Sequence, residues 1–183
     1  MLERRRRMSK YYAGIGSRKT PPEERNRIRE IALDLNRQGY TLRSGGADGA
    51  DTYFEEGATK KEIFLPWDGF NKRPISKDAS PGATYFQGAT DAAVALAQRV
   101  IDGFEDRNDA VRMILARNMH QVLGEDLRTP VEFVVCWTPE GKVIGGTGHA
   151  IKLARSRGIP VYNLARPSDV AKLRKKIFQV ELF

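Results

Sequence analysis

The chain has 183 residues, of which 40% are hydrophobic and 30% are charged, with a net charge of +8. This length is close to that of one domain, and no apolar run is long enough to cross a bilayer, which excludes a membrane-spanning protein. The single cysteine, Cys136, excludes an internal disulfide, and no apolar segment follows the basic N-terminus. We therefore expect a cytoplasmic protein with no membrane partner.

The positive charge is concentrated at the N-terminus. Residues 1–10 contain four arginines and one lysine against one glutamate, which is about half of the net excess. Such runs are usually solvated, so we expect 1–10 to be a basic, disordered tail and 11–183 to be a single domain. A role in binding phosphate is the alternative for this tail.

The first part of the chain predicts a strand, a helix and a second strand. Tyr11–Gly16 is a short strand that enters a glycine turn. The helix that follows has Thr20 as its expected N-cap and Gly39 as its stop. The chain then resumes as a strand over Tyr40–Ser44.

The middle of the chain predicts one strand and three helices. A helix ends near Gly57, and a strand covers 61–67. Residues 68–84 are rich in Pro, Gly, Ser, Asn and Lys without clear periodicity, which predicts a long surface connection. Two helices follow, over Thr90–Phe104 and Asp109–Leu123.

The last part returns to alternation of strand and helix. Val131–Trp137 is almost continuously apolar, as is typical of a parallel strand buried on both faces. A turn, a helix over 148–158, a strand over Ile159–Leu164 and a closing helix over Ser168–Phe178, capped by Ser168, complete the prediction. This order predicts an α/β, Rossmann-like fold whose mostly parallel sheet has helices on both faces.

Three glycine-rich segments follow predicted strands: Gly14–Arg18, Ser44–Asp51 and Gly145–Ala150. Open α/β sheets bind ligands at the carboxyl ends of their strands. Glycine lets the backbone approach a ligand, and the start of the following helix offers free N–H groups to an anion. Tight turns without a ligand are the alternative interpretation, but together the segments favour phosphate binding.

Polar side chains in these segments have distinct expected roles. Ser17 is suited to donate a hydrogen bond to phosphate, and Arg18 to clamp it with two. Asp48 and Asp51 are suited to ribose hydroxyls or a reacting carbon, although either could merely cap a helix. Near the start of a helix, His149 is expected to be neutral and to act as a donor or a stacking ring.

A polar stripe lies on one of the predicted helices. Arg117 and Gln121 are one turn apart, and Asn118 lies beside them, so the stripe either reaches into a cleft or is a solvated face. Two histidines and one cysteine provide no zinc-binding spacing, so we expect neither metal nor cofactor. The predicted ligand-binding residues are Gly14, Gly16, Ser17, Arg18, Ser44, Gly45, Gly46, Asp48, Gly49, Asp51, Arg117, Asn118, Gln121, Gly145, Gly146, Thr147, Gly148 and His149.

Taken in order, the segments YYAGIGSRKTP, LRSGGADGADTYFEEGA and GGTGHAIKLARSRGIPVYNL resemble the Smf/DprA and Lonely-guy (SLOG) superfamily. The resemblance extends from Tyr11 to Leu164 and is greater to small bacteriophage proteins similar to the DNA recombination-mediator protein DprA. It implies a Rossmann-like fold that recognises phosphate and ribose. It also implies a homo-oligomer, for which the apolar residues of the C-terminal IFQVELF offer a surface.

The chain departs from the phosphoribohydrolase branch of this superfamily. That branch carries GGxGTxxE and an upstream catalytic arginine, which Arg117 matches, whereas His149 stands at the threonine and Lys152 at the glutamate. Glycosidic cleavage passes through a cation-like sugar that a carboxylate stabilises and an ammonium does not. The resemblance therefore favours binding over catalysis, with Asp48, Asp51 and Glu55 as candidates to replace the missing acid.

Three functions remain open. The leading hypothesis is a protein that binds the phosphate and ribose of a nucleotide or nucleotide-derived signal through the three glycine-rich segments. The second is a DprA-like mediator that binds single-stranded DNA. The third is an enzyme that cleaves an N-glycosidic bond with an altered acidic residue.

Overall fold

The computed structural model describes residues 10–179. The arginines of the predicted basic tail and residues 180–183 of the C-terminal segment lie outside the described residues. No helix within 10–179 is long and apolar enough to cross a membrane.

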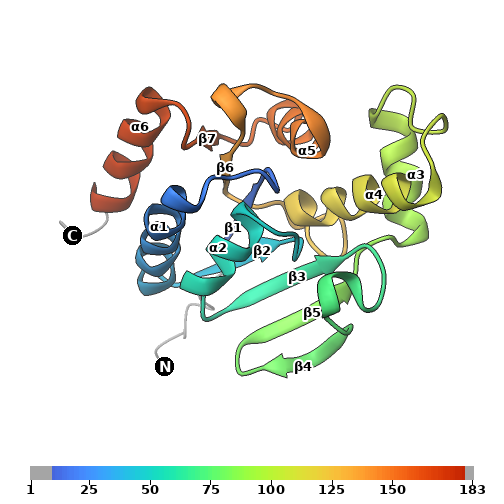
Figure 1. Cartoon of the computed structure of the whole chain (residues 1–183), viewed down its shortest axis with the longest axis horizontal. Coiled ribbons are helices and arrows are strands. Elements are labelled where there is room, and N and C mark those ends of the chain that lie inside the picture. Colours follow the sequence, from blue (N-terminus) through green and yellow to red (C-terminus); the bar gives the residue numbers. More distant parts are fainter. Residues whose placement is uncertain (1–9, 180–183) are drawn as a thin grey trace, which may run out of the picture.

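A single seven-stranded sheet forms the centre of the molecule (Figure 1). All neighbouring strands are parallel except the outermost pair, β4 and β5. This arrangement confirms the predicted α/β fold with a mostly parallel sheet. In spatial order the strands are β4 (Ser76–Ser80), β5 (Ala83–Gln87), β3 (Lys61–Leu65), β2 (Tyr40–Ser44), β1 (Lys10–Gly16), β6 (Phe133–Trp137) and β7 (Val161–Asn163).

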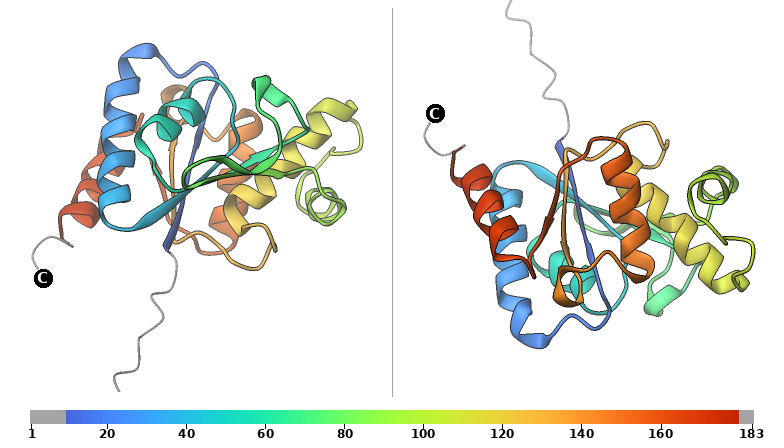
Figure 2. Two further views of the ribbon diagram at one scale, coloured as in Figure 1. Left: turned by 90° about the horizontal axis from the view of Figure 1, so that it is seen from below. Right: turned by 90° about the horizontal axis from the view of Figure 1, so that it is seen from above.

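Helices cover both faces of the sheet, as predicted (Figure 2). Successive residues of β1 alternate between the two resulting cores: Tyr12 packs on one side, and Ala13 and Ile15 on the other. The Tyr12 side is covered by α1 (Arg25–Arg37), α2 (Ala50–Gly57) and α6 (Pro167–Phe178). The opposite side is covered by α3 (Asp91–Val100), α4 (Asp109–Leu123) and α5 (Gly145–Ser156).

Strand order reverses at β1. The chain moves from β1 to β2 and β3 on one side, then returns through α3 and α4 to place β6 against the other side of β1. In open α/β sheets this reversal leaves a crevice beyond the carboxyl ends of the two strands. The first glycine segment follows β1, and the third follows β6, so both lie at this crevice.

The prediction of a long connection over 68–84 is wrong, because a β-hairpin occupies much of it. β4 pairs antiparallel with β5, and Gly82 adopts a φ of +80° between them. The hairpin escaped prediction because β4, at the sheet edge, is almost entirely exposed and therefore lacks an alternating apolar pattern. β5 carries a stronger signal in its β-branched and aromatic residues, which follow a Pro-Gly turn.

Two predicted helix caps are also wrong. Thr20 is buried and donates its hydroxyl hydrogen to the Ser17 carbonyl, while a short 3-10 turn, Pro22–Glu24, precedes α1. Ser168 lies inside α6, which begins at Pro167 without a side-chain cap. In both places proline at the first turn starts the helical segment instead, because its fixed φ suits a helix.

Candidate functional site

A cavity of about 350 Å³ opens at the carboxyl ends of β1 and β6. It collects residues from all three glycine-rich segments and from the polar stripe on α4. The predicted residues that line it are Gly16, Ser17, Arg18, Asp51, Arg117, Asn118, Gln121, Gly145, Gly146 and Thr147.

The turn after β1 forms one wall of the cavity. The Ser17 N–H donates to the Trp137 carbonyl, 3.0 Å away, which joins this turn to the end of β6. The Ser17 hydroxyl accepts a 3.0 Å hydrogen bond from the backbone of Lys19. Arg18 and Lys19 are exposed and both line the cavity, so this turn adds two cations to it.

At two positions of the predicted set, close packing leaves no room for a side chain larger than that of glycine. A Cβ on Gly14 would lie 2.6 Å from the ring of Phe54 and 2.7 Å from Leu42, so Gly14 lets α2 approach β1. Gly49 has a φ of +77°, and a Cβ there would lie 2.4 Å from the Ser17 carbonyl oxygen. It therefore lets the second glycine segment lie against the first.

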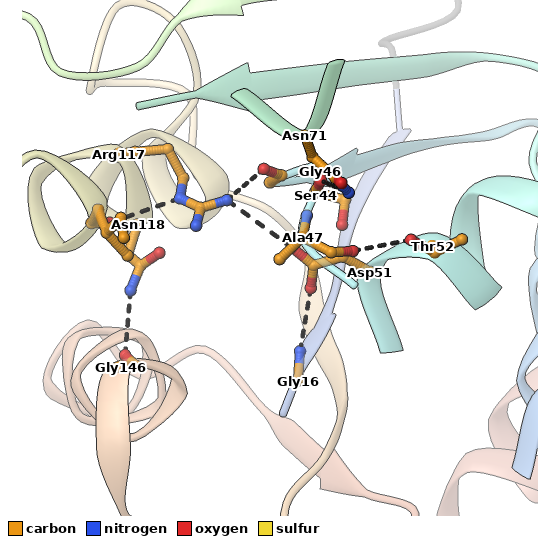
Figure 3. Close-up of polar contacts among 12 residues, drawn as sticks. Gly16, Ser44, Gly46, Ala47, Asp51, Thr52, Asn71, Arg117, Asn118 and Gly146 are labelled. Carbon is orange, nitrogen blue, oxygen red and sulfur yellow. Dashed lines mark hydrogen bonds and ion pairs between the residues drawn. The ribbon is translucent and has the colours of Figure 1, made fainter. Parts of the chain in front are cut away.

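Asp51, in the first turn of α2, joins these two segments through its carboxylate (Figure 3). Its Oδ1 accepts a 3.2 Å hydrogen bond from the Gly16 N–H, and its Oδ2 accepts one of 3.3 Å from Ala47. The residue is 3% exposed. Burial raises the pKa of Asp51 from 3.8 to about 6, although Arg117 and the two N–H groups favour the ionised form.

Arg117 reaches the same place from α4. Its Nη1 donates a short hydrogen bond to the Gly45 carbonyl and lies 3.8 Å from Oδ2 of Asp51. The guanidinium carbon lies 5.7 Å from the centre of the Phe70 ring. Burial lowers the pKa of Arg117 to about 10, and the attraction of Asp51 offsets this only in part.

The third segment is held by the same helix. Asn118 donates a 3.0 Å hydrogen bond to the Gly146 carbonyl, in the first turn of α5 (Figure 3). α5 begins at Gly145, earlier than predicted, and no side chain caps its N-terminus. Because the first backbone N–H groups of a helix have no partner within it, the exposed start of α5 offers donors and a positive dipole at the cavity.

The stripe on α4 therefore reaches into a cavity and is not a solvated face. Arg117, Asn118 and Gln121 are each 5% exposed or less. Through Gly45 and Gly146 the stripe holds the second and third segments, and through Asp51 it connects to the first.

The other candidate acids lie away from the cavity lining. Asp48 is exposed and accepts a 3.1 Å hydrogen bond from Asn71. Glu55 forms a short ion pair with Arg73. Asp51 is thus the only candidate acid that lines the cavity.

The remaining predicted residues surround the cavity without lining it. Ser44 is buried and donates to the Gly14 carbonyl at 2.7 Å. His149 is half-buried, and its pKa is lowered by burial and by the nearby charges of Arg107 and Lys152, which favours the neutral imidazole. The others outside the lining are Gly14, Gly45, Gly46, Gly49 and Gly148.

Sequence reasoning missed several lining residues. Two of them could have been predicted from sequence neighbours: Lys19 directly follows Arg18, and Ile114 is one helical turn before the polar stripe. Thr138 could not have been predicted, because its position depends on a distant residue of β7: its hydroxyl accepts a 2.6 Å hydrogen bond from Asn163. The further unpredicted members of the lining are Ile15, Ala47, Pro139 and Ile144.

The described residues show no metal centre. Between residues 10 and 179 no group of three His, Cys, Asp or Glu side chains is arranged to hold a metal ion. Cys136 is buried inside β6, and burial raises the pKa of its thiol to about 12, so it is not a reactive thiolate.

No family model matches the chain, and no curated protein matches it. Among solved structures, DNA processing protein A (DprA) from Helicobacter pylori superposes with a TM-score of 0.56 and 20% identity, over 91% of this chain and 72% of that one. This is a DprA-like Rossmann-type fold. The report of that neighbour concerns its mode of binding single-stranded DNA.

Two other matches have lower scores. The molybdenum-cofactor carrier protein of Chlamydomonas superposes with a TM-score of 0.48 and 16% identity, over 92% of this chain and 84% of that one. DprA from Streptococcus pneumoniae gives a TM-score of 0.44 and 14% identity, over 85% of this chain and 50% of that one. At these identities, the similarities concern the fold alone.

Proposed function

We propose that this protein binds the phosphate-bearing part of a nucleotide or nucleotide-derived ligand in the cavity between β1, α4 and α5. The observation that carries the proposal is the balance of charge around the cavity. Three cationic side chains, Arg18, Lys19 and Arg117, line it together with one carboxylate, Asp51. That carboxylate is already occupied by two backbone N–H groups and an arginine, so the surplus is positive.

Backbone groups add to this preference for an anion. The start of α5 is uncapped and exposed at Gly145 and Gly146, which suits a phosphate in the way that helix N-termini commonly do. Ile114 on α4 and Ile144, which directly precedes α5, supply apolar surface to the same cavity. A cavity with apolar walls and a few convergent polar groups is typical of small-ligand sites.

The volume favours a small ligand. About 350 Å³ is near the lower end of the range of roughly 300–1,000 Å³ for small-molecule sites. A mononucleotide suits this volume better than a long dinucleotide does.

A thermal-shift screen of nucleoside monophosphates, dinucleotides and ADP-ribose tests the proposal. A ligand at a hundred times its dissociation constant stabilises the folded state by about 2.7 kcal/mol. In a chain of this size each kcal/mol raises Tm by about 2–4 °C, so a true ligand produces a shift of about 5–11 °C. The double variant Arg18→Gln, Lys19→Gln is the matched control and should reduce the shift; if no compound moves Tm, the proposal fails.

Single-stranded DNA is the second candidate ligand. It is favoured by the superposition on Helicobacter pylori DprA, whose single-stranded DNA binding is described, and by the net charge of +8. If this candidate is correct, affinity for an oligothymidylate falls steeply with salt, and the slope decreases when residues 1–7, with their four arginines, are removed. Binding that is absent or insensitive to salt would exclude it.

Cleavage of an N-glycosidic bond is the less supported alternative. Asp51 is the one candidate acid in the cavity, but it lies among backbone N–H groups and beside Arg117. Release of free base from nucleoside monophosphates that is lost in Asp51→Asn would support catalysis. No product after prolonged incubation would end this alternative.

A further inference from the structure

We propose that the cavity takes up one proton together with its anionic ligand, and that the proton moves from the solvent to the carboxylate of Asp51. This inference rests on the proposed function, because it concerns regulation of the same site. Its basis is that, among residues 10–179, Asp51 is the only carboxylate that lines a cavity otherwise suited to anions.

The position of Asp51 creates a conflict of charge. Its carboxylate lines the same cavity as Arg18, Lys19 and the start of α5, the groups proposed to hold the phosphate, and it is only 3% exposed. Two like charges near each other in a poorly solvated place repel strongly, and one of them responds by binding a proton. A bound anion therefore raises the proton affinity of Asp51, and by linkage a proton on Asp51 raises the affinity for the anion.

In the free protein Asp51 already binds a proton more readily than an ordinary aspartate, because burial raises its pKa to about 6. A phosphate nearby moves this pKa further upward. Once the bound-state pKa exceeds the working pH, each unit by which the pH falls toward 6 tightens binding by up to tenfold. Below about pH 6 the effect levels off, since Asp51 is then protonated in the free protein as well.

Other charged groups near Asp51 do not cancel this effect. Arg117 faces it from α4, and Arg18 and Lys19 lie on the turn after β1, so all three of these neighbours are cationic side chains. On α2 itself, Glu55 lies one turn further along and is paired with Arg73. Asp51 is thus the carboxylate with both a shifted pKa and a place in the cavity.

His149 is the competing proton acceptor. It lies in the first helical turns of α5, is half-buried, and has a lowered pKa, so an anion at the start of α5 would also favour its protonation. It does not line the cavity, whereas Asp51 does. His149→Gln is therefore the control variant that separates the two sources.

Isothermal titration calorimetry at pH 7.5 in two buffers of different ionisation enthalpy counts the protons directly. The probes are AMP and ADP-ribose; the second lacks a phosphate monoester, whose own pKa lies near 6. We expect an uptake of about 0.5–1 proton in the unmodified protein and in His149→Gln. We expect none with ADP-ribose in Asp51→Asn, whose affinity should be nearly constant from pH 6 to 8.

Each outcome bears on the proposal. Binding of a probe without proton uptake overturns this inference and leaves the proposed function standing. Uptake that is lost in His149→Gln overturns it in favour of the histidine. If no nucleotide of the thermal-shift screen binds, AMP and ADP-ribose included, the inference and the proposed nucleotide site fail together. If Asp51→Asn does not fold, the number of protons taken up by the unmodified protein and by His149→Gln still decides between Asp51 and His149 as the acceptor.

Discussion

Replacing Arg117 with methionine tests whether the site is held together by its buried ion pair. Methionine keeps the apolar stem but removes the guanidinium, so the Gly45 carbonyl loses a donor and Asp51 loses its counter-charge. Removing one partner of a buried pair costs about 3–5 kcal/mol. The 3.8 Å between Nη1 of Arg117 and Oδ2 of Asp51 is long for an ion pair. We therefore expect a loss of stability at the lower end of this range, about 3 kcal/mol at pH 8.

The expected loss depends on pH, because Asp51 can become neutral. Its pKa is raised from 3.8 to about 6 on folding, so the folded protein binds a proton that the unfolded chain releases. Asp51 therefore contributes stability that is gained as pH falls from about 6 toward 4 and lost as pH rises through 6. Without Arg117 the folded pKa rises further, so the deficit of the variant is greater at pH 8 than at pH 5.5.

Urea unfolding at pH 8 and pH 5.5 measures both effects. At pH 8 we expect the free energy of unfolding to fall by about 3 kcal/mol, which in thermal unfolding would lower Tm by about 6–12 °C in a chain of this size. Arg18→Met is the matched control, because Arg18 lines the same cavity but is exposed, and its loss should change stability by less than about 0.5 kcal/mol. A deficit that is absent at pH 8, or equal at both pH values, would refute the reasoning.

Three further predictions separate packing from binding. Gly14→Ala should destabilise the protein by about 1–3 kcal/mol in urea unfolding, because its Cβ would lie 2.6 Å from Phe54 in the core. Gly146→Ala should be neutral or stabilise by up to about 1 kcal/mol, because a Cβ there meets no atom closer than 3.9 Å and alanine favours a helix. Arg18→Gln with Lys19→Gln should weaken nucleotide binding at least tenfold by calorimetry while leaving Tm within about 2 °C, since both side chains are exposed.

Elements with strong local patterns could be predicted from the sequence. The continuous apolar run of β6 and the helical spacing of apolar residues in α4 are both visible within one short stretch of sequence. Both elements form where they were predicted. The outer strand of the β4–β5 hairpin has no such pattern in its sequence. It is an exposed edge strand that is held by hydrogen bonds to β5 and not by a buried apolar face. Its existence depends on β3, to which β5 pairs in parallel.

The site was predictable to the level of segments but not of contacts. Glycine after a strand and polar residues at helical spacing pointed to residues that gather at one cavity, because both signals are local. The partners of those residues are not local: Arg117 contacts Gly45 across 72 positions, and Asp51 contacts Gly16 across 35. For the same reason the pairing of Glu55 with Arg73 could not be foreseen, since it depends on the loop that precedes the hairpin.

The energetics of the Asp51–Arg117 pair favour a functional origin over a structural one. Both pKa shifts are toward the neutral forms, so the mutual attraction does not fully compensate for the removal of the two charges from water. Apolar side chains of similar volume commonly fill such positions at equal or lower free energy. Because this pair lines the cavity, we infer a role toward the ligand: under the proposed function Arg117 attracts the anion, and protonation of Asp51 sets the pH at which that attraction is strongest.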